Sequence, residues 1–217
     1  MAKLQAVIYD LDGVITDTAE YHYLAWKTLA EELHIPFDRS FNEQLKGLSR
    51  VDSLEKILAE GTEQYSPTER QRLAEKKNDH YKSLIQEIGP KDLLPGVYQF
   101  MLEVKEAGIK TGLASASKNA RTVIEKLEIT HLLDTVVDAA TVERGKPDPE
   151  VFLKAAQQLH VEPSQCVGIE DAKSGVTAIK SAGMYAVGVG DEQNLSEADW
   201  VISDTSHLSL DRLKEKL

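Results

Sequence analysis

The sequence has little cysteine and no long hydrophobic run. Cys166 is the single cysteine among 217 residues, so the chain cannot form an internal disulfide. It lies in the apolar run 166–169, which favours a small buried hydrophobe over a catalytic thiol. The first apolar stretch ends at Asp10, too early for a signal peptide or a membrane span. We therefore expect a cytoplasmic protein in a reducing environment, with no membrane partner.

Basic residues are also outnumbered by acidic ones, 25 lysines and arginines against 36 aspartates and glutamates, which gives a formal net charge of −11 at pH 7. Binding to nucleic acid is driven by clustered lysines and arginines that release counterions. The composition thus argues against a nucleic-acid partner. It leaves a small anionic substrate open, because a few basic residues can still gather locally.

Residues 17–89 carry only helix signals. Ser66 is followed by Pro67 and Glu69, a pattern typical of a capped helix start. Asp17 with Glu20 predicts a similar capping box at the beginning of the segment. The absence of strand patterns indicates a small helical domain.

Strand and helix patterns alternate from about residue 93 onward. Together with the first apolar run, the expected strands are residues 6–9, 109–114, 132–137, 166–169 and 184–189. Repeated units of this length predict an α/β fold, a doubly wound parallel sheet with helices on both faces. We therefore expect a core domain of residues 1–16 and 90–217, interrupted by a helical domain of residues 17–89.

Asp10 and Asp12 follow the first predicted strand, at the edge where open α/β sheets bind ligands. Residues i and i+2 of a strand point the same way, so both carboxylates are expected to face one small volume. Two acidic groups repel there unless a cation, a shared proton or a reaction intermediate lies between them. The pair is therefore a candidate catalytic or metal-binding site.

Polar motifs follow other predicted strands. The run 115–119 offers hydroxyls, backbone N–H groups and a helix start that can hold a phosphate. Lys146 precedes a helix, and its ammonium can neutralise a phosphoryl group. Glu170 and Asp171 add two carboxylates, which with Asp10 supply oxygen ligands suited to Mg²⁺.

Each motif has a plain alternative. Asp-Gly is a common turn, Ser115 or Ser117 suits an ordinary helix cap, and Lys146 suits a solvated loop. Glu170 and Asp171 equally suit the positive end of the following helix. These explanations do not predict an acid pair, hydroxyls, a lysine and a second acid pair in that order. The combination therefore favours phosphate chemistry.

The four motifs resemble those of the haloacid dehalogenase superfamily over the full length of the chain. They are Asp10-Leu11-Asp12-Gly13-Val14, Ser115-Ala116-Ser117-Lys118-Asn119, Lys146-Pro147 and Gly168-Ile169-Glu170-Asp171. The resemblance implies a Rossmann-like core whose helical insertion is the cap of the first subclass. It also implies Mg²⁺ as the cofactor, bound by the carboxylates of Asp10, Glu170 and Asp171 and by the main-chain carbonyl of Asp12.

The cap is similar to that of the sugar-phosphate mutases of this superfamily. The similarity rests on residues 10–22, 42–50, 52–53, 77–78 and 114–119, whereas Tyr9 replaces a more usual phenylalanine. It implies that Asp10 carries the phosphoryl group and that Asp12 is the general acid and base. The implied reaction interconverts β-D-glucose 1-phosphate and D-glucose 6-phosphate through β-glucose 1,6-bisphosphate. We expect small sugar phosphates as partners, and a monomer.

The resemblance also assigns substrate contacts. Arg50 is expected to bind the distal phosphate, because its planar guanidinium can donate hydrogen bonds to two oxygens at once. Ser117, Lys118 and Asn119 are expected to bind the same phosphate. A cap that closes on the substrate would exclude water, and its hinge is expected near Thr18 and His22. The other substrate-binding residues expected are Lys46, Gly47, Ser53, Lys77, Asn78, Ser115, Ala116 and Lys146. For any single cap residue, a solvated helix surface is the plain alternative.

Two other functions stay open at this point. A sugar-phosphate phosphatase on the same fold would let water attack phosphorylated Asp10. A receiver module would share the α/β sheet, the phosphorylated aspartate and the lysine, but it would lack the helical insertion and give Asp12 no acid–base task.

Overall fold

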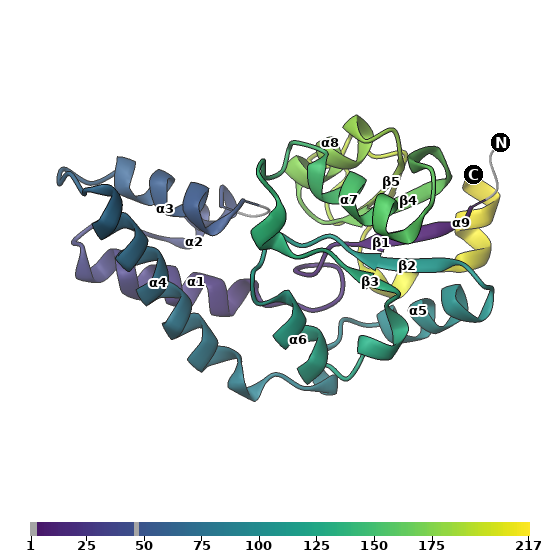
Figure 1. Cartoon of the computed structure of the whole chain (residues 1–217), viewed down its shortest axis with the longest axis horizontal. Helices are drawn as coiled ribbons and strands as arrows, with labels where there is room; N and C mark the ends of the chain where they lie inside the picture. The colour runs from purple at the N-terminus through teal and green to yellow at the C-terminus, as the bar shows by residue number, and fades with distance from the viewer. Residues whose placement is uncertain (1–3, 46–47) are drawn as a thin grey trace. The chain divides into compact units, whose positions relative to one another are not determined.

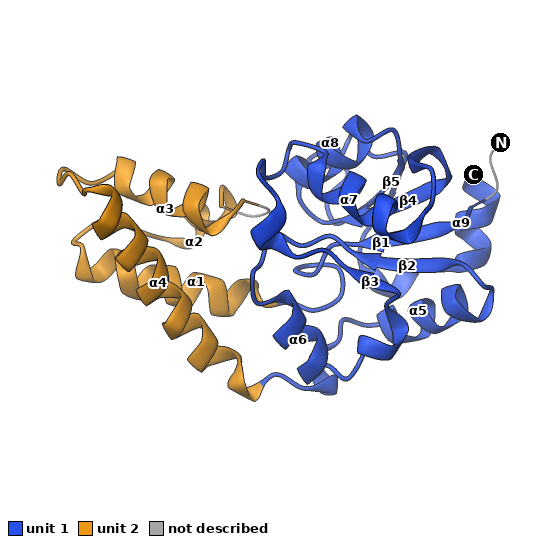
Figure 2. Cartoon of the chain, viewed as in Figure 1, with its two compact units in different colours: residues 1–17, 88–217 blue, residues 18–87 orange. Residues whose placement is uncertain are grey.

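The computed structural model describes residues 4–45 and 48–217 (Figure 1). The chain forms two compact units, one of residues 1–17 with 88–217 and one of residues 18–87 (Figure 2). We call the first the core unit and the second the cap unit. The domain boundaries expected from the sequence, after residues 16 and 89, stay a prediction.

The core unit is built on a parallel sheet with strand order β3-β2-β1-β4-β5-β6. The chain runs outward from β1 in one direction and from β4 in the other, so a topological switch point lies between β1 and β4. This confirms the doubly wound sheet. The strands are β1 (Ala6–Tyr9), β2 (Lys110–Leu113), β3 (Thr135–Val136), β4 (Cys166–Glu170), β5 (Tyr185–Val189) and β6 (Trp200–Ile202).

Helices cover both faces of this sheet (Figure 1). They are α5 (Val97–Glu106), α6 (Ala120–Lys126), α7 (Glu150–Leu159), α8 (Lys173–Ser181) and α9 (Leu210–Lys216). Short 3₁₀ helices occur at Pro90–Asp92, Thr130–Leu132, Ala139–Thr141, Pro163–Gln165 and Thr205–His207. Helix α7 packs on β1 and β2, and α8 packs on β4 and β5.

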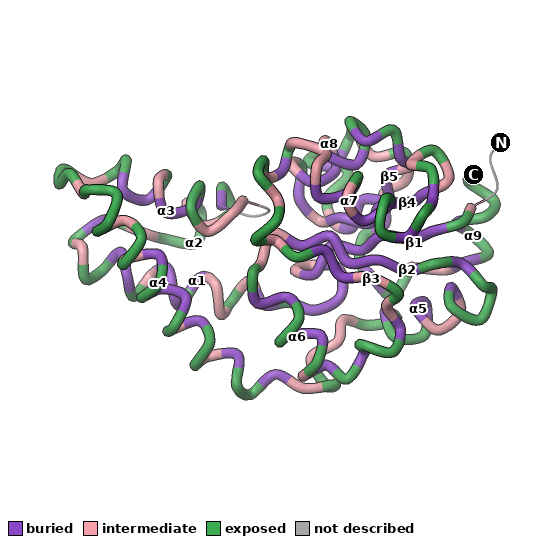
Figure 3. The backbone as a smooth tube through the Cα atoms, in the orientation of Figure 1, coloured by how far each residue is buried: buried purple, intermediate pink, exposed green. Residues whose placement is uncertain are grey.

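Every residue of β1 is buried, and Figure 3 colours the strand accordingly. Ala6 and Ile8 belong to the apolar cluster formed with α7 and α8. Tyr9 packs edge-on against Phe100 of α5, with 6.2 Å between the ring centres. Alternate side chains thus fill the two layers, which explains why a central parallel strand is apolar throughout.

The cap unit has an apolar core of its own. Its helices are α1 (Ala19–Glu32), α2 (Arg39–Glu43), α3 (Arg50–Ala59) and α4 (Pro67–Leu84), followed by a 3₁₀ helix at Ile85–Glu87. Helices α1 and α4 pack together, and Trp26, Leu29, Leu54 and Ile57 are buried in one cluster. Among the residues that the structure describes, no helix is long and apolar enough to cross a membrane.

The two helix starts expected in the cap unit have different outcomes. The capping box of Ser66 and Glu69 is present at the start of α4. The box expected from Asp17 and Glu20 is wrong, because α1 begins after Thr18 without a side-chain cap. The carboxylate of Glu20 instead accepts two hydrogen bonds, at 2.6 and 2.9 Å, from the guanidinium of Arg39.

Two strands also differ from expectation. The strand expected at residues 132–137 is reduced to Thr135–Val136, because Leu132 ends a 3₁₀ helix. Strand β6 was not expected, because its three residues are too few to set up a periodic pattern. Both lie at the edges of the sheet, where pairing with a neighbour rather than local pattern defines the strand.

Candidate active site

Asp10 and Asp12 lie just past the carboxyl end of β1. The strand ends at Tyr9, so the loop that follows, and not strand alternation, orients the two carboxylates. Gly13 adopts a φ of 75°, and its N–H donates to the carbonyl of Thr16 at 2.8 Å. This positive φ favours glycine and turns the chain sharply back. The turn leaves Asp10 buried and Asp12 partly exposed.

Lys146 is buried against this acidic site. Its ammonium donates to Oδ1 of Asp10 at 2.6 Å and to Oε1 of Glu170 at 2.8 Å. The same nitrogen lies 5.1 Å from the ring centre of Phe152 on α7. Only 1% of the lysine side chain is exposed, so the alternative of a solvated loop lysine is excluded.

Burial and charge together set the protonation equilibria here. Burial raises the pKa of Asp10 to about 8, against the pull of Lys146 and with help from the nearby carboxylates of Glu170 and Asp12. For Lys146, burial alone would lower the pKa, but Asp10 and Glu170 outweigh it and raise the pKa above that of an ordinary lysine. Lys146 is therefore held as a cation where phosphoryl charge would develop.

Glu170 and Asp171 bring a second acidic pair to the same edge. Oε2 of the fully buried Glu170 accepts the N–H groups of Asp171 at 2.7 Å and Ala172 at 3.0 Å. Ligand oxygens of Asp10, Glu170 and Asp171 all lie within 4.8 Å of one another. Three converging carboxylates suit a hard divalent cation, so these residues fit the Mg²⁺ that the motifs predict.

Two glycines allow these carboxylates to approach the main chain closely. A Cβ on Gly175 in α8 would lie 1.7 Å from Oε1 of Glu170. A Cβ on Gly13 would lie 2.2 Å from Oδ2 of Asp171. The sequence interpretation gave Gly175 no role. The available signal was a glycine inside a helical pattern, which costs about 1 kcal/mol relative to alanine and so calls for a reason.

The run 115–119 leaves the carboxyl end of β2, the strand paired with β1. Oγ of the buried Ser115 accepts the N–H of Ser117 at 3.1 Å, and Oγ of Ser117 accepts the N–H of Asn119 at 3.2 Å. Both serines therefore stabilise the turn before α6, but neither is the helix cap of the plain alternative, because the N-cap residue of α6 is Asn119. A hydroxyl that accepts a hydrogen bond keeps its own O–H to donate. Phosphate binding by this run, including Ala116 and the exposed Lys118, stays a prediction.

In the cap unit, His22 and Lys77 form a polar pair among aromatic rings. The ammonium of Lys77 lies 2.7 Å from Nδ1 of His22 and 4.4 Å from the ring centre of Trp26. The imidazole stacks on Tyr81 with 4.1 Å between ring centres. Burial lowers the pKa of His22 well below its usual range, and the charges of Lys77 and Arg50 add to this effect. His22 is therefore the neutral acceptor of the pair.

Other cap residues expected to bind substrate are more enclosed than a solvated surface would be. Ser53, Lys77 and Asn78 are buried. Thr18 is fully buried, and its Oγ1 accepts a hydrogen bond from the hydroxyl of Tyr81 at 3.3 Å. This burial contradicts the solvated-surface alternative for these positions, although their roles toward a substrate stay predictions.

Three expected cap residues have other outcomes. Arg50 begins α3 and is only partly buried. Burial lowers its pKa, and the acidic groups of Asp79 and Glu75 oppose that shift. Lys46 and Gly47 lie outside the described residues.

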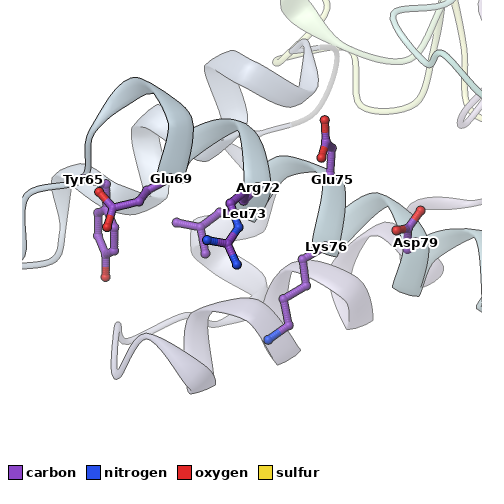
Figure 4. A pocket seen from close by; sticks show the side chains of 7 residues that line it. All are labelled: Tyr65, Glu69, Arg72, Leu73, Glu75, Lys76 and Asp79. Atoms are coloured by element: carbon purple, nitrogen blue, oxygen red, sulfur yellow. The ribbon is translucent and has the colours of Figure 1, made fainter.

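A hollow of about 620 Å³ lies elsewhere in the cap unit, along α4 (Figure 4). Its lining comes from Tyr65 and from side chains between Glu69 and Asp79. Charged groups of this lining are engaged locally, as in the pair of Lys76 with Glu32 at 2.5 Å. None of the catalytic, metal-binding or substrate-binding residues predicted from the sequence lines the hollow, so it is separate from the candidate site.

Comparison with known proteins places this geometry in a family. Residues 4–183 match the family model of haloacid dehalogenase-like hydrolases. The chain is 51% identical to beta-phosphoglucomutase of Bacillus subtilis, over 98% of this chain and 95% of that protein. It is 33% identical to a phosphorylated carbohydrates phosphatase of Thermotoga maritima, over 99% of this chain and 100% of that protein.

A solved structure agrees with this placement. The crystal structure of beta-phosphoglucomutase from Clostridium difficile matches with a TM-score of 0.96 and 47% identity, over 98% of this chain and 96% of that chain. The chain is therefore similar to these relatives in both sequence and fold over nearly its whole length. The chain belongs to the haloacid dehalogenase-like hydrolase family.

Proposed function

We propose that this protein is a β-phosphoglucomutase, which interconverts β-D-glucose 1-phosphate and D-glucose 6-phosphate. The observation that carries the phosphoryl-transfer part of the proposal is the buried contact of Lys146 with Asp10 and Glu170, at the ends of β1 and β4. Its support in sequence is the 51% identity to a protein of that name over 98% of the chain. A phosphatase could share the buried lysine, so the choice of a mutase rests on the similarity.

In this mechanism, a carboxylate oxygen of Asp10 forms a bond to phosphorus and carries the phosphoryl group between the two positions of the sugar. Phosphorylated Asp10 donates it to the 6-hydroxyl of β-glucose 1-phosphate while Asp12 removes the hydroxyl proton. The β-glucose 1,6-bisphosphate formed turns over. Asp10 then attacks the 1-phosphate, the bond from phosphorus to the sugar oxygen breaks, and Asp12 returns the proton to that oxygen. Glucose 6-phosphate leaves.

Charge is the main obstacle to this reaction, because a carboxylate must approach an anionic phosphoryl group. Lys146 offsets that charge as a cation fixed beside Asp10. Asp10, Glu170 and Asp171, with the main-chain carbonyl of Asp12, would hold Mg²⁺. When bound, the ion would neutralise further negative charge on the phosphoryl oxygens.

Substrate binding is assigned to both units. We propose that Arg50 binds the phosphate that is not transferred, and that the hinge of the cap lies near Thr18 and His22. Phosphate contacts in the core unit come from residues 115–119. The sugar contacts proposed in the cap unit are Lys46, Gly47, Ser53, Lys77 and Asn78. The enzyme is further proposed to be a cytoplasmic monomer that is phosphorylated on Asp10 during turnover.

A coupled assay with both anomers of glucose 1-phosphate tests the proposal. Glucose 6-phosphate should form from the β anomer, faster when the 1,6-bisphosphate is added, and formation should stop when EDTA removes divalent metal. A preference for the α anomer would overturn the assignment. Release of inorganic phosphate without glucose 6-phosphate would instead support a phosphatase, the activity named for the Thermotoga maritima relative.

Replacement of Asp12 tests the acid–base role by itself. Asp12→Ala should lower mutase turnover by about 100- to 10,000-fold, the usual range for a general acid or base. Unchanged turnover would exclude the proposed role and would leave Asp12 without a catalytic task, as in a receiver module.

A further inference from the structure

The loop that carries Lys146 is attached to the first turn of α7 through one carboxylate. Oε1 of Glu150 accepts the backbone N–H of Glu143 at 2.9 Å, and Oε2 accepts the backbone N–H of Arg144 at 2.9 Å. One side chain therefore fixes two successive peptide groups, the nearer of them two residues before Lys146. The mechanism above gives Glu150 no part.

Further contacts brace the same loop. Lys154, one helical turn after Glu150, donates to Oε1 of Glu150 at 2.6 Å and also to the carbonyl of Thr141. The N–H of Asp148 donates to the carbonyl of Gly145 at 3.0 Å, and Oδ1 of Asp148 accepts the N–H of Glu150 at 3.0 Å. The main chain is thus held on both sides of Lys146.

Helix α7 connects this brace to the reacting groups. Two residues beyond Glu150, the ring of Phe152 lies under the ammonium of Lys146, 5.1 Å away. The ammonium then reaches Asp10 at 2.6 Å and Glu170 at 2.8 Å. Helix α7 therefore supports both ends of Lys146, its main chain through Glu150 and its side chain through Phe152.

We propose that Glu150 is a positioning residue that acts through Lys146, because its carboxylate fixes the peptide groups of Glu143 and Arg144 and so aims the lysine at Asp10. The inference rests on the proposed function, in which Lys146 neutralises the phosphoryl group. The competing explanation is that Glu150 only favours the positive end of α7. That role needs a negative charge in the first turn, but it does not need each carboxylate oxygen to accept a backbone N–H of the loop.

The state of Glu150 suits a permanent brace. Its hydrogen bond with Lys154, followed by those from the N–H groups of Glu143 and Arg144, lowers its pKa to about 2. Its side chain is 14% exposed. Glu150 is therefore ionised near neutral pH, and both carboxylate oxygens are acceptors.

Glu150→Gln is the sharpest test, because the amide keeps the size of the side chain but offers one acceptor in place of two. One backbone N–H then meets an NH₂ group, and the loop should shift. We expect kcat of the mutase to fall by about 10- to 100-fold, part of the loss usual for removal of a charge-stabilising group. The KM should change less than about threefold, because substrate binding is assigned to other residues.

A second readout does not depend on the assigned reaction. The side chain of Lys146 is 1% exposed, so its reductive methylation should be slow in the wild-type enzyme. Glu150→Gln should increase that rate by about tenfold or more if local opening becomes easier by about 1.4 kcal/mol. Peptide mass spectrometry measures modification of Lys146 separately from that of other lysines.

The matched control is Asp138→Asn. Asp138 also uses a carboxylate to accept a backbone N–H, that of Ala140 at 2.9 Å, in the turn just before the loop. It should leave both kcat and the methylation of Lys146 near wild-type values. If Glu150→Gln does not fold, Glu150→Asp, which keeps the charge but withdraws the carboxylate by one methylene, takes its place.

The outcomes separate this inference from the function on which it rests. Slower turnover at nearly constant KM together with faster methylation supports it. Methylation at the wild-type rate, or effects no larger than those of Asp138→Asn, overturns it. A wild-type enzyme without mutase activity would contradict the proposed function, whereas the methylation rates would still decide whether Glu150 positions Lys146.

Discussion

The core unit and the cap unit each bury a lysine, and the surroundings of the two differ. Lys146 in the core unit contacts the carboxylates of Asp10 and Glu170 at 2.6 and 2.8 Å. Lys77 in the cap unit contacts a neutral imidazole nitrogen of His22 at 2.7 Å and the faces of two aromatic rings. Both side chains would be costly to bury without such partners.

The difference separates two ways of holding a buried cation. Carboxylates fix the charge of Lys146 but also carry their own desolvation penalty, so removing the lysine would leave two buried negative groups. Aromatic rings and a ring nitrogen stabilise the charge of Lys77 more weakly. Protonation of His22 would place a second positive charge beside that ammonium and so weaken the contact. We therefore expect chemistry to be most sensitive in the core unit, and pH sensitivity of folding to be most evident in the cap unit.

Lys146→Met is expected to have the largest effect. It should lower mutase kcat by about 100- to 1000-fold, because a charge aimed at the reacting group is lost. Lys110→Met is the control, since Lys110 begins β2 and donates to the carbonyl of Leu159 at 2.5 Å. Equal losses in the two variants, measured in the coupled assay, would mean that the core unit depends on its lysines only for folding.

Gly175→Ala should weaken Mg²⁺ binding by about 10- to 100-fold, as changes next to metal ligands do. The added methyl would lie 1.7 Å from Oε1 of Glu170 and would displace the carboxylate. Isothermal titration calorimetry measures the affinity directly.

Gly168→Ala is the control for this change, because its methyl would meet carbons of Ile179 at 2.6 Å and greater distances. It disturbs packing in the same unit without touching a carboxylate. Magnesium affinity reduced as much by Gly168→Ala would contradict the specific role of Gly175.

His22→Gln should make stability less dependent on pH. The pKa of His22 in the folded chain lies well below the ordinary 6.5, so the unfolded chain takes up the proton first as the pH falls. The stability contributed by neutral His22 is complete well above pH 6.5, the ordinary pKa that applies to the unfolded chain. It is lost as the pH falls from there toward the lower pKa of the folded chain, by up to about 1.4 kcal/mol per pH unit.

Urea unfolding at pH 7.0 and 5.5 measures this dependence. The wild-type chain should lose more stability between these pH values than His22→Gln does. His131→Gln, an exposed histidine of the core unit, serves as the control and should behave like the wild type. Identical pH dependence in wild type and His22→Gln would remove the proposed contrast between the units.

The smallest effects concern two fully buried tyrosines, one in each unit. The hydroxyl of Tyr9 has no hydrogen-bond partner among the described residues, whereas that of Tyr81 donates to Thr18 at 3.3 Å. Tyr9→Phe should therefore raise the free energy of unfolding by about 1 kcal/mol, and Tyr81→Phe should lower it by a similar amount. Urea midpoints give both values, and changes of the same sign would contradict the contrast.

Sequence alone located much of the core unit. Apolar runs and their spacing gave the central strands, and the resemblance of four short motifs named the family before any geometry was known. The sequence pattern did not predict β6 or the length of β3, because short edge strands are defined by pairing with their neighbours and not by periodicity. The capping box at Asp17 failed for a related reason, since Arg39, nineteen residues after Glu20, competes for the same carboxylate.

The roles of single residues divide in the same way. The sequence determined that acids, hydroxyls and a lysine stand at strand ends, because the order of residues fixes the chemistry that each strand can deliver. Only the tertiary structure decided that Lys146 is buried between Asp10 and Glu170, that Gly175 leaves room for Glu170, and that Glu150 braces the loop. The contacts of Lys146 join segments far apart in the chain, and those of Gly175 and Glu150 depend on how a loop folds back on a helix, which no local pattern records.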